Sequence, residues 1–212
     1  MICLSLKKQY SKNEMEETIA FVERFGGRIR DDLIGIHEFD DGTGRGIIAR
    51  GEITKGTVLV QVPIKCLVTL SNLDHLSLGL FPDRDELSET DRLALFLIWA
   101  KNHKTIPGFS NYLTVLPKTL DQSMFWSAEE LELIRGTDSH LIAGLLKKQT
   151  IKDSLLIGVD YEEYQWALGM LWSRCMDFFR PDGSSFRVMA PFADMFNADF
   201  DVDVSHQLNT SK

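Results

Sequence analysis

The stretch GTGRGIIARGEITKGTVLVQVP, residues 42–63, decides the fold class of this chain. Its apolar segments are short and rich in β-branched residues, and glycine-containing turns separate them, which is typical of strands. The segment LIGIHEF just before it has the same character. Together these segments predict strands at about 33–39, 45–50 and 57–63.

Three glycines, Gly42, Gly44 and Gly46, precede one of these strands. Glycine permits a positive φ and a close approach of the backbone to a ligand. A dinucleotide fingerprint needs a strand before the glycines and a helix after them, whereas a strand follows here. The chain also contains no GxxxxGK[ST] sequence, so both kinds of nucleotide site are excluded. On the residues alone, a tight hairpin turn is the simpler interpretation.

A helix is predicted before the strands, from Asn13 to about Phe25. Asn13 is a suitable N-cap, and Gly26 and Gly27 are suitable residues to end the helix. The apolar residues repeat at helical spacing and should form one buried face. They are Met15, Ile19, Val22 and Phe25.

A block of helices follows residue 87. Ser127 and Asp160 are N-cap candidates, and each has a glutamate three residues later. The apolar periodicity predicts helices at about 88–103, 127–136, 139–152 and 160–179. Strand character returns near 186–190.

This order of strands, helices and strands predicts an α+β protein. It fits a small all-β unit interrupted by a helical insertion, and it does not fit alternating βαβ units. We place an N-terminal helix and strand segment at 13–87, the helical insertion at 88–180, and a second strand segment at 181–212. Since no Gly/Ser linker separates these parts, we expect one compact unit.

Composition restricts the classes of partner. The 212-residue chain has a net charge of −8 and no clustered lysines or arginines, so no nucleic-acid partner is predicted. The longest apolar run, residues 93–100, is far shorter than the roughly 20 residues of a membrane span. No signal peptide is recognisable either. We therefore expect no membrane partner.

The cysteines and histidines indicate neither a disulfide framework nor a metal site. The three cysteines are scattered and odd in number, which favours free thiols in the cytoplasm or the nucleus. Cys175, inside the predicted apolar helix, is most simply a core residue. The five histidines lie far apart and show no ligand spacing, so no metal is predicted.

Three polar residues near the end of the chain are candidates for a site. Arg174 lies among apolar side chains in the predicted helix, where it is either a surface cation or a partner for a carboxylate. Asp194 and Asn197 follow a short apolar run and lie one helical turn apart. Asp and Asn both favour turns, so a capped turn explains them equally well.

Taken in order, four segments resemble the SET-domain protein lysine methyltransferases. The class most similar is that of the Rubisco large-subunit methyltransferase. The segments are residues 42–63, YLTVLPKTLDQSMFWSAEELELIRGT at 112–137, Ser173–Arg174, and PFADMFNA at 191–198. The resemblance covers about 30–204. It implies a SET-type fold of short strands interrupted by an α-helical insertion, incomplete at its C-terminal end.

This resemblance implies an S-adenosyl-L-methionine-dependent methyltransferase of lysine side chains in proteins. The substrate would be a lysine-bearing protein, with ribosomal proteins and histones among the candidates. Arg174 would lie near the carboxylate of the cofactor. The residues implied in cofactor binding are Thr43, Gly44, Arg45, Gly46, Arg174, Asp194, Asn197 and Ala198.

The sequence departs from the family pattern in two places. Ala198 stands where the family has His, and no GEE....YG segment with the catalytic-site Tyr occurs before Lys212. The catalytic residue is therefore unassigned, and we expect an incomplete form of the enzyme. A non-catalytic SET-like protein-binding module is the alternative, and an unrelated α+β interaction protein is a third reading.

Overall fold

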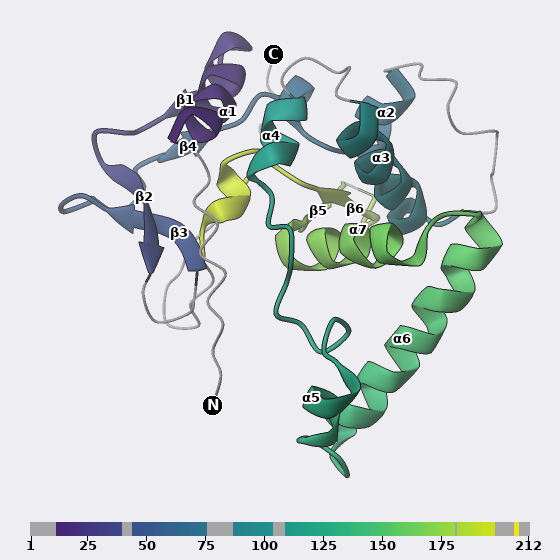
Figure 1. Ribbon diagram of the computed structural model, residues 1–212. Helices are drawn as coiled ribbons and strands as arrows, with labels where there is room; N and C mark the ends of the chain where they lie inside the picture. Colours follow the sequence, from purple (N-terminus) through teal and green to yellow (C-terminus); the bar gives the residue numbers. More distant parts are fainter. Residues whose placement is uncertain are drawn as a thin grey trace.

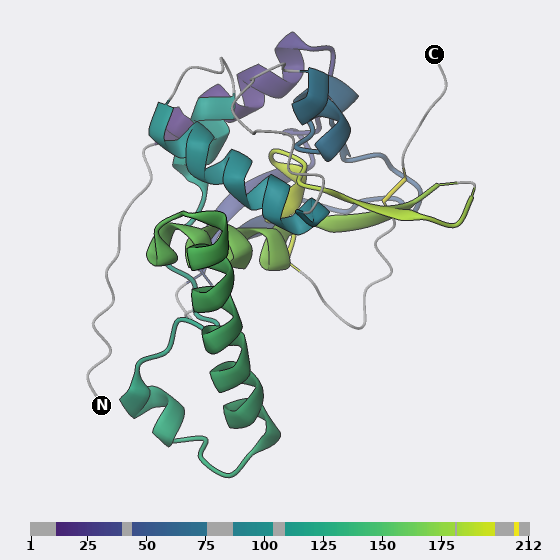
Figure 2. The ribbon, with the colours of Figure 1, turned by 90° about the vertical axis from the view of Figure 1, so that its right-hand side faces the viewer.

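The computed structural model describes residues 12–39, 44–75, 87–103, 109–180, 182–197 and 206–207. Within them, antiparallel strand pairs flank a group of packed helices (Figure 1). Helices α5 (Ala128–Glu132) and α6 (Asp138–Ile157) extend away from the other elements (Figure 2). In the described residues, no helix is long and apolar enough to cross a membrane.

Helix α1 (Lys12–Arg24) ends where the glycines predicted. Gly26 has a φ of +87°, in the left-handed region that glycine adopts without strain. The Gly26 N–H donates to the Glu23 carbonyl at 2.9 Å, and the Gly27 N–H donates to the Val22 carbonyl at 3.0 Å. This pair of bonds is a Schellman motif, which satisfies carbonyls that the end of the helix leaves open.

Two details of the predicted first helix are wrong. The helix begins at Lys12, so Asn13 lies within it and is not the residue that precedes it. Phe25 is 46% exposed, while Phe21 is buried and contacts the ring of Phe109 at 5.4 Å between centroids. Phe25 lies beyond the last helical residue, between the end of α1 and the left-handed turn at Gly26.

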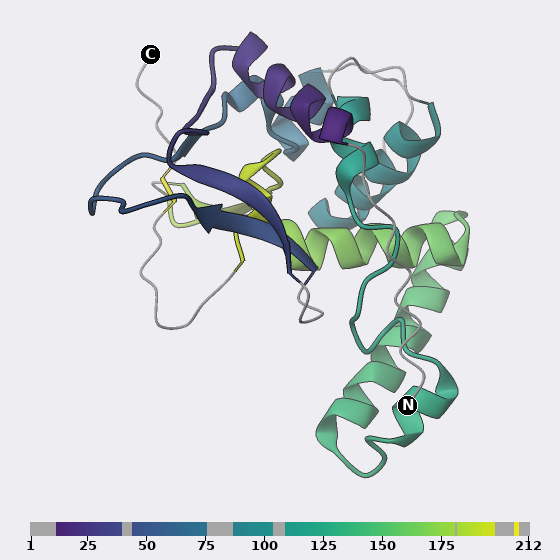
Figure 3. The same ribbon diagram turned by 60° about the vertical axis from the view of Figure 1, so that its left-hand side comes forward.

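The strands of the first half form two antiparallel pairs. β2 (Ile34–Phe39) pairs with β3 (Gly44–Ala49), with Ile36 opposite Ile47, and this hairpin confirms two of the predicted strands (Figure 3). β1 (Arg28–Ile29) pairs with β4 (Val60–Gln61). β4 is much shorter than the predicted strand at 57–63, since its partner β1 offers only two residues for pairing.

The predicted helical block is confirmed, and its caps are local. The Ser127 hydroxyl accepts from the Glu130 N–H at 3.2 Å, and the Glu130 carboxylate accepts from the Ser127 N–H at 2.7 Å. This reciprocal pair is a capping box at the start of α5. Before α5 lie the long helix α3 (Glu89–His103) and the short helices η1 (Ile64–Cys66), α2 (Leu70–His75) and α4 (Phe109–Val115).

Helix α7 (Tyr161–Arg174) is shorter than predicted at its C-terminal end. Cys175 has extended backbone angles, so it follows the helix and does not lie inside it. The next residues form β5 (Met176–Phe179), which pairs with β6 (Ser185–Val188). The apolar run continues across this boundary, and pairing with β6 converts its second part into a strand.

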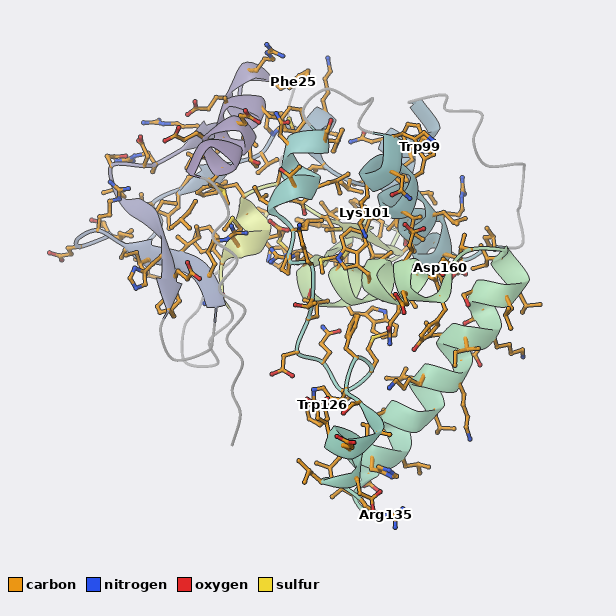
Figure 4. All side chains as sticks on the ribbon, in the orientation of Figure 1. Phe25, Trp99, Lys101, Trp126, Arg135 and Asp160 are labelled. Atoms are coloured by element: carbon orange, nitrogen blue, oxygen red, sulfur yellow. The ribbon has the colours of Figure 1, made fainter. Side chains whose placement is uncertain are left out.

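The packing of α3 against α7 forms the centre of the helical group. Leu93 and Leu97 of α3 and Met170 of α7 are all fully buried. At the edge of this interface, the amine of Lys101 lies 4.3 Å from the ring centroid of Trp166 (Figure 4). This contact joins the two helices with a cation–π interaction. The packing of α7 against α3 thereby fixes the position of Arg174, the last residue of α7.

Candidate functional site

The site is built around a sharp bend in the segment PFADMF. The single turn η2 (Ala193–Met195) follows Phe192, which has a φ of +72° and a ψ of −46°. This conformation is rare for a residue with a side chain, and it persists here because Phe192 is buried in the core. No side chain caps η2, so the capped-turn interpretation of Asp194 is wrong.

Asp194 instead turns its side chain inward, where it is fully buried. The Tyr112 hydroxyl of α4 donates to Asp194 Oδ2 at 2.6 Å. Arg174 Nη1, at the end of α7, donates to the same Oδ2 at 3.2 Å and to the Asp194 carbonyl at 3.2 Å. Three segments distant in sequence therefore meet at one carboxylate.

Burial and the two donors act in opposite directions on Asp194. Burial raises the pKa of its carboxyl, while Arg174 and Tyr112 favour the ionised form and only partly offset this rise. Burial also raises the pKa of Tyr112 well above its usual value, and the neighbouring carboxylate adds to the effect. Tyr112 thus keeps its proton and serves as a donor, not as a base.

Two buried polar atoms of this cluster have no hydrogen-bond partner among the described residues. They are Asp194 Oδ1 and Arg174 Nε. The Arg174 side chain is only 15% exposed, which rules out the surface-cation interpretation. Arg174 binds a carboxylate of its own chain, and its cofactor role stays a prediction.

The glycine turn meets the same segment from the other side. Gly44 begins β3 with a φ of +84°, and no described heavy atom lies within 4 Å of the position that a β-carbon would take. A β-carbon on Gly46 would lie 2.5 Å from Asn197 Nδ2. The backbone of β3 and the Asn197 side chain are therefore in direct contact, as only glycine permits.

Arg45 connects this turn to α4. Its Nη2 donates to the Val115 carbonyl at 2.5 Å. Val115 is the last residue of α4, one helical turn after Tyr112. The glycine turn and the Asp194 cluster are thus both hydrogen-bonded to the same short helix.

The structure brings most of the predicted site residues together. Asn197 touches Gly46, and three residues earlier Asp194 binds Arg174. Thr43 and Ala198 lie outside the described residues. The other predicted site residues lie on β3, at the end of α7, or in and just after η2. They are Gly44, Arg45, Gly46, Arg174, Asp194 and Asn197.

Tyr112 is the residue of this cluster that the sequence analysis did not assign. It is buried, and its hydroxyl makes the shortest hydrogen bond to Asp194. The signal available in the sequence was its place as the first residue of the motif at 112–137. A single tyrosine at the head of a helical motif does not indicate which polar group it will meet.

Chemically, this arrangement can bind and orient a polar ligand. Arg174 is a cation held by Asp194, and its buried Nε has no partner among the described residues, which suits an anionic group. No described heavy atom lies within 4 Å of the β-carbon position of Gly44, so the backbone there is open to close approach, whereas Asn197 covers Gly46. The cluster holds its polar groups in place before a ligand arrives.

Comparison with known proteins gives a consistent set of relatives. No family profile matches the chain. It is 31% identical over 168 residues to the chloroplastic [fructose-bisphosphate aldolase]-lysine N-methyltransferase of Arabidopsis thaliana, covering 73% of this chain and 34% of the relative. It is 27% identical over 176 residues to the chloroplastic Rubisco large-subunit N-methyltransferase of Nicotiana tabacum, covering 73% and 33%.

Solved structures show the same fold. The SET domain of a Rubisco large-subunit methyltransferase bound to lysine and AdoHcy superposes with a TM-score of 0.76 at 20% identity, covering 92% of this chain and 46% of that one. A structure of the enzyme with sinefungin and monomethyllysine gives a TM-score of 0.74 at 21% identity, covering 91% and 46%. The predicted SET-type α+β fold and the predicted resemblance are confirmed. The chain spans about a third of the length of these curated relatives.

Proposed function

We propose, on the premise that this chain has the SET fold of the Rubisco large-subunit methyltransferase class, that it forms the cofactor-binding part of a protein lysine methyltransferase. The observation that carries the proposal is the junction of the Arg174–Asp194 pair with the Gly46–Asn197 contact. It joins three of the four segments that carry the resemblance to this class. The methyl donor would be S-adenosylmethionine, and the acceptor a lysine side chain of a protein.

The residues present fit this cofactor. Bound S-adenosylmethionine supplies an activated methyl group on its sulfonium. The Arg174 guanidinium, with its unpartnered Nε, suits the α-carboxylate of the cofactor. The backbone of Gly44, Arg45 and Gly46 would contact the cofactor, and Asn197, which touches Gly46, would frame it beside them. The proposed cofactor-binding residues also include Thr43 and Ala198, which lie outside the described residues.

For the substrate, we propose a lysine in a basic protein. A lysine amine attacks only when it is neutral, and a dry environment lowers its pKa by disfavouring the charged form. Alignment of the amine with the methyl group then supplies much of the rate. The net charge of −8 favours a basic partner, with ribosomal proteins and histones as candidates.

The proposed location is the cytoplasm or the nucleus. The support is the scattered, odd set of three cysteines, which suits a reducing compartment. Two of the relatives carry the word chloroplastic in their names. Imaging of a tagged chain in intact cells tests this location, and a signal confined to an organelle contradicts it.

A non-catalytic SET-like binding module is the second candidate. The observation that favours it is Ala198, which stands where the class has His. Both candidates use the same fold, and they differ in whether a methyl group is transferred.

Calorimetric titration with S-adenosylhomocysteine tests the cofactor site. We expect the chain to bind and Arg174→Ala to weaken binding by at least about tenfold, since a charge-assisted contact is lost. Arg135→Ala is the matched control, because Arg135 is an exposed arginine that follows α5 and lies far from Asp194 (Figure 4). Equal affinities for the two variants would remove Arg174 from the site.

Transfer of a labelled methyl group to histones and ribosomal proteins separates the two functions. Transfer that requires Arg174 supports the enzyme. Cofactor binding without any transfer supports the binding module. A chain that neither binds nor transfers overturns the proposal.

A further inference from the structure

Two donors from different helices converge on a single oxygen of Asp194. The Tyr112 hydroxyl lies 2.6 Å from Oδ2, and Arg174 Nη1 lies 3.2 Å from the same atom. The other oxygen, Oδ1, has no partner among the described residues. One oxygen therefore fixes the orientation of the whole carboxylate, and the shorter of its two bonds comes from Tyr112.

We infer that Tyr112 is a positioning residue of the cofactor site: it holds Asp194, and Asp194 in turn orients the Arg174 guanidinium. The inference rests on the proposed function for the identity of the ligand. Arg174 is bound by Asp194 through both its side chain and its carbonyl, so a rotation of the carboxylate moves its counter-ion. Tyr112 acts on the ligand only through this pair.

The charged and titratable groups facing Asp194 are few. Tyr112 approaches from α4 and Arg174 from the end of α7. Next to Arg174, burial raises the pKa of the Cys175 thiol to about 12, so it is uncharged at neutral pH. Tyr112 and Arg174 are thus the groups that favour the ionised form of Asp194 against the effect of its burial.

A second tyrosine in the same protein supplies a matched control. Tyr164 of α7 is also almost fully buried, and its hydroxyl donates to Asp91 Oδ1 at 2.5 Å. This bond joins α7 to α3 and includes none of the site residues. Tyr112→Phe and Tyr164→Phe therefore remove the same chemical group and the same kind of bond, one inside the site and one outside it.

The first measurement is the affinity of each variant for S-adenosylhomocysteine between about pH 5 and pH 8. We expect Tyr112→Phe to weaken binding about tenfold at neutral pH and Tyr164→Phe to change it less than about twofold. We also expect the loss of affinity on acidification to begin at higher pH in Tyr112→Phe, because Asp194 lacks one stabilising donor. Equal effects of the two substitutions overturn the inference.

The second measurement asks whether Tyr112 acts through Asp194. In an Asp194→Ala background both carboxylate oxygens are absent, so adding Tyr112→Phe should change the affinity less than about twofold further. A full tenfold loss in that background would mean that Tyr112 acts on the ligand by another route, and the inference would be wrong.

Failure of the proposed function is separable from failure of this inference. If the unmodified chain does not bind S-adenosylhomocysteine, the proposed function fails. The role of Tyr112 is then decided by urea unfolding over the same pH range. Because the pKa of Asp194 is raised in the folded state, its contribution to stability falls as pH rises through that pKa. Tyr112→Phe should extend this fall to higher pH and Tyr164→Phe should not; identical profiles overturn the inference.

Discussion

The side-chain amide of Asn197 lies directly against Gly46, so that a β-carbon at position 46 would be 2.5 Å from Asn197 Nδ2. This contact joins the first strand hairpin to the segment after η2, across about 150 residues of chain. The proposed cofactor site depends on it, since it sets the spacing between the glycine turn and Asp194.

Gly46→Ala should displace Asn197 and destabilise the protein. We expect a loss of about 1–3 kcal/mol in the free energy of unfolding, as in other overpacked sites, together with weaker binding of S-adenosylhomocysteine. The control is Gly144→Ala in α6, where no described heavy atom lies within 4 Å of the new β-carbon. That substitution should raise stability by about 0.5–1 kcal/mol. Urea unfolding measures both, and a loss for each would contradict the steric explanation.

Asp160 should contribute measurably to the stability of α7. Its Oδ1 accepts from the N–H groups of Glu162 and Glu163 at 2.9 Å and 3.0 Å, and it lies at the start of the helix that carries Arg174 (Figure 4). Asp160→Ala should lower the free energy of unfolding by about 1 kcal/mol. Asp160→Asn keeps an acceptor and should cost much less. If the two substitutions cost the same, the cap is not the cause.

Stability should decline at alkaline pH because of one buried and one half-buried thiol. Burial raises the pKa of Cys66 from 9.0 to about 11 and that of Cys175 from 9.0 to about 12. A thiol whose pKa is raised in the folded state stabilises the protein fully below its unfolded pKa. This contribution is lost as pH rises through the folded pKa. We therefore expect the free energy of unfolding to fall from about pH 9 upward.

Urea unfolding between about pH 8 and pH 11 checks this expectation. Cys175→Ala removes one of the two titrating groups, so its stability should fall less steeply with pH than that of the unmodified chain. The buried tyrosines add a decline of the same sign, which Cys175→Ala leaves in place. A pH profile unchanged by Cys175→Ala would show that this thiol does not contribute.

Local features of the fold follow from residues a few positions apart. The Ser127 capping box, the Asp160 cap and the turn at Gly26 all lie where the sequence predicts them. The hairpin of β2 and β3 is equally local, because the two strands are close neighbours in the chain. Such features need only backbone geometry and short-range hydrogen bonds.

The C-terminal end of α7 shows where local information was insufficient. The segment from Trp172 to Phe179 is compatible with a helix throughout. The structure ends the helix at Arg174, since Met176–Phe179 pairs with Ser185–Val188. A strand obtains its hydrogen bonds from a partner strand, and the residues of the segment itself do not specify that partner.

The sequence by itself determined the order of strands and helices, the local caps and the family resemblance of its four motifs. Only the tertiary structure decided that Tyr112, Arg174 and Asp194 share one buried carboxylate oxygen, although 82 residues separate Tyr112 from Asp194. The physical reason is that a hydrogen bond between side chains depends on which groups packing brings face to face. Packing in turn depends on the whole chain, because the bend at the buried Phe192 and the turn η2 place Asp194 against Tyr112.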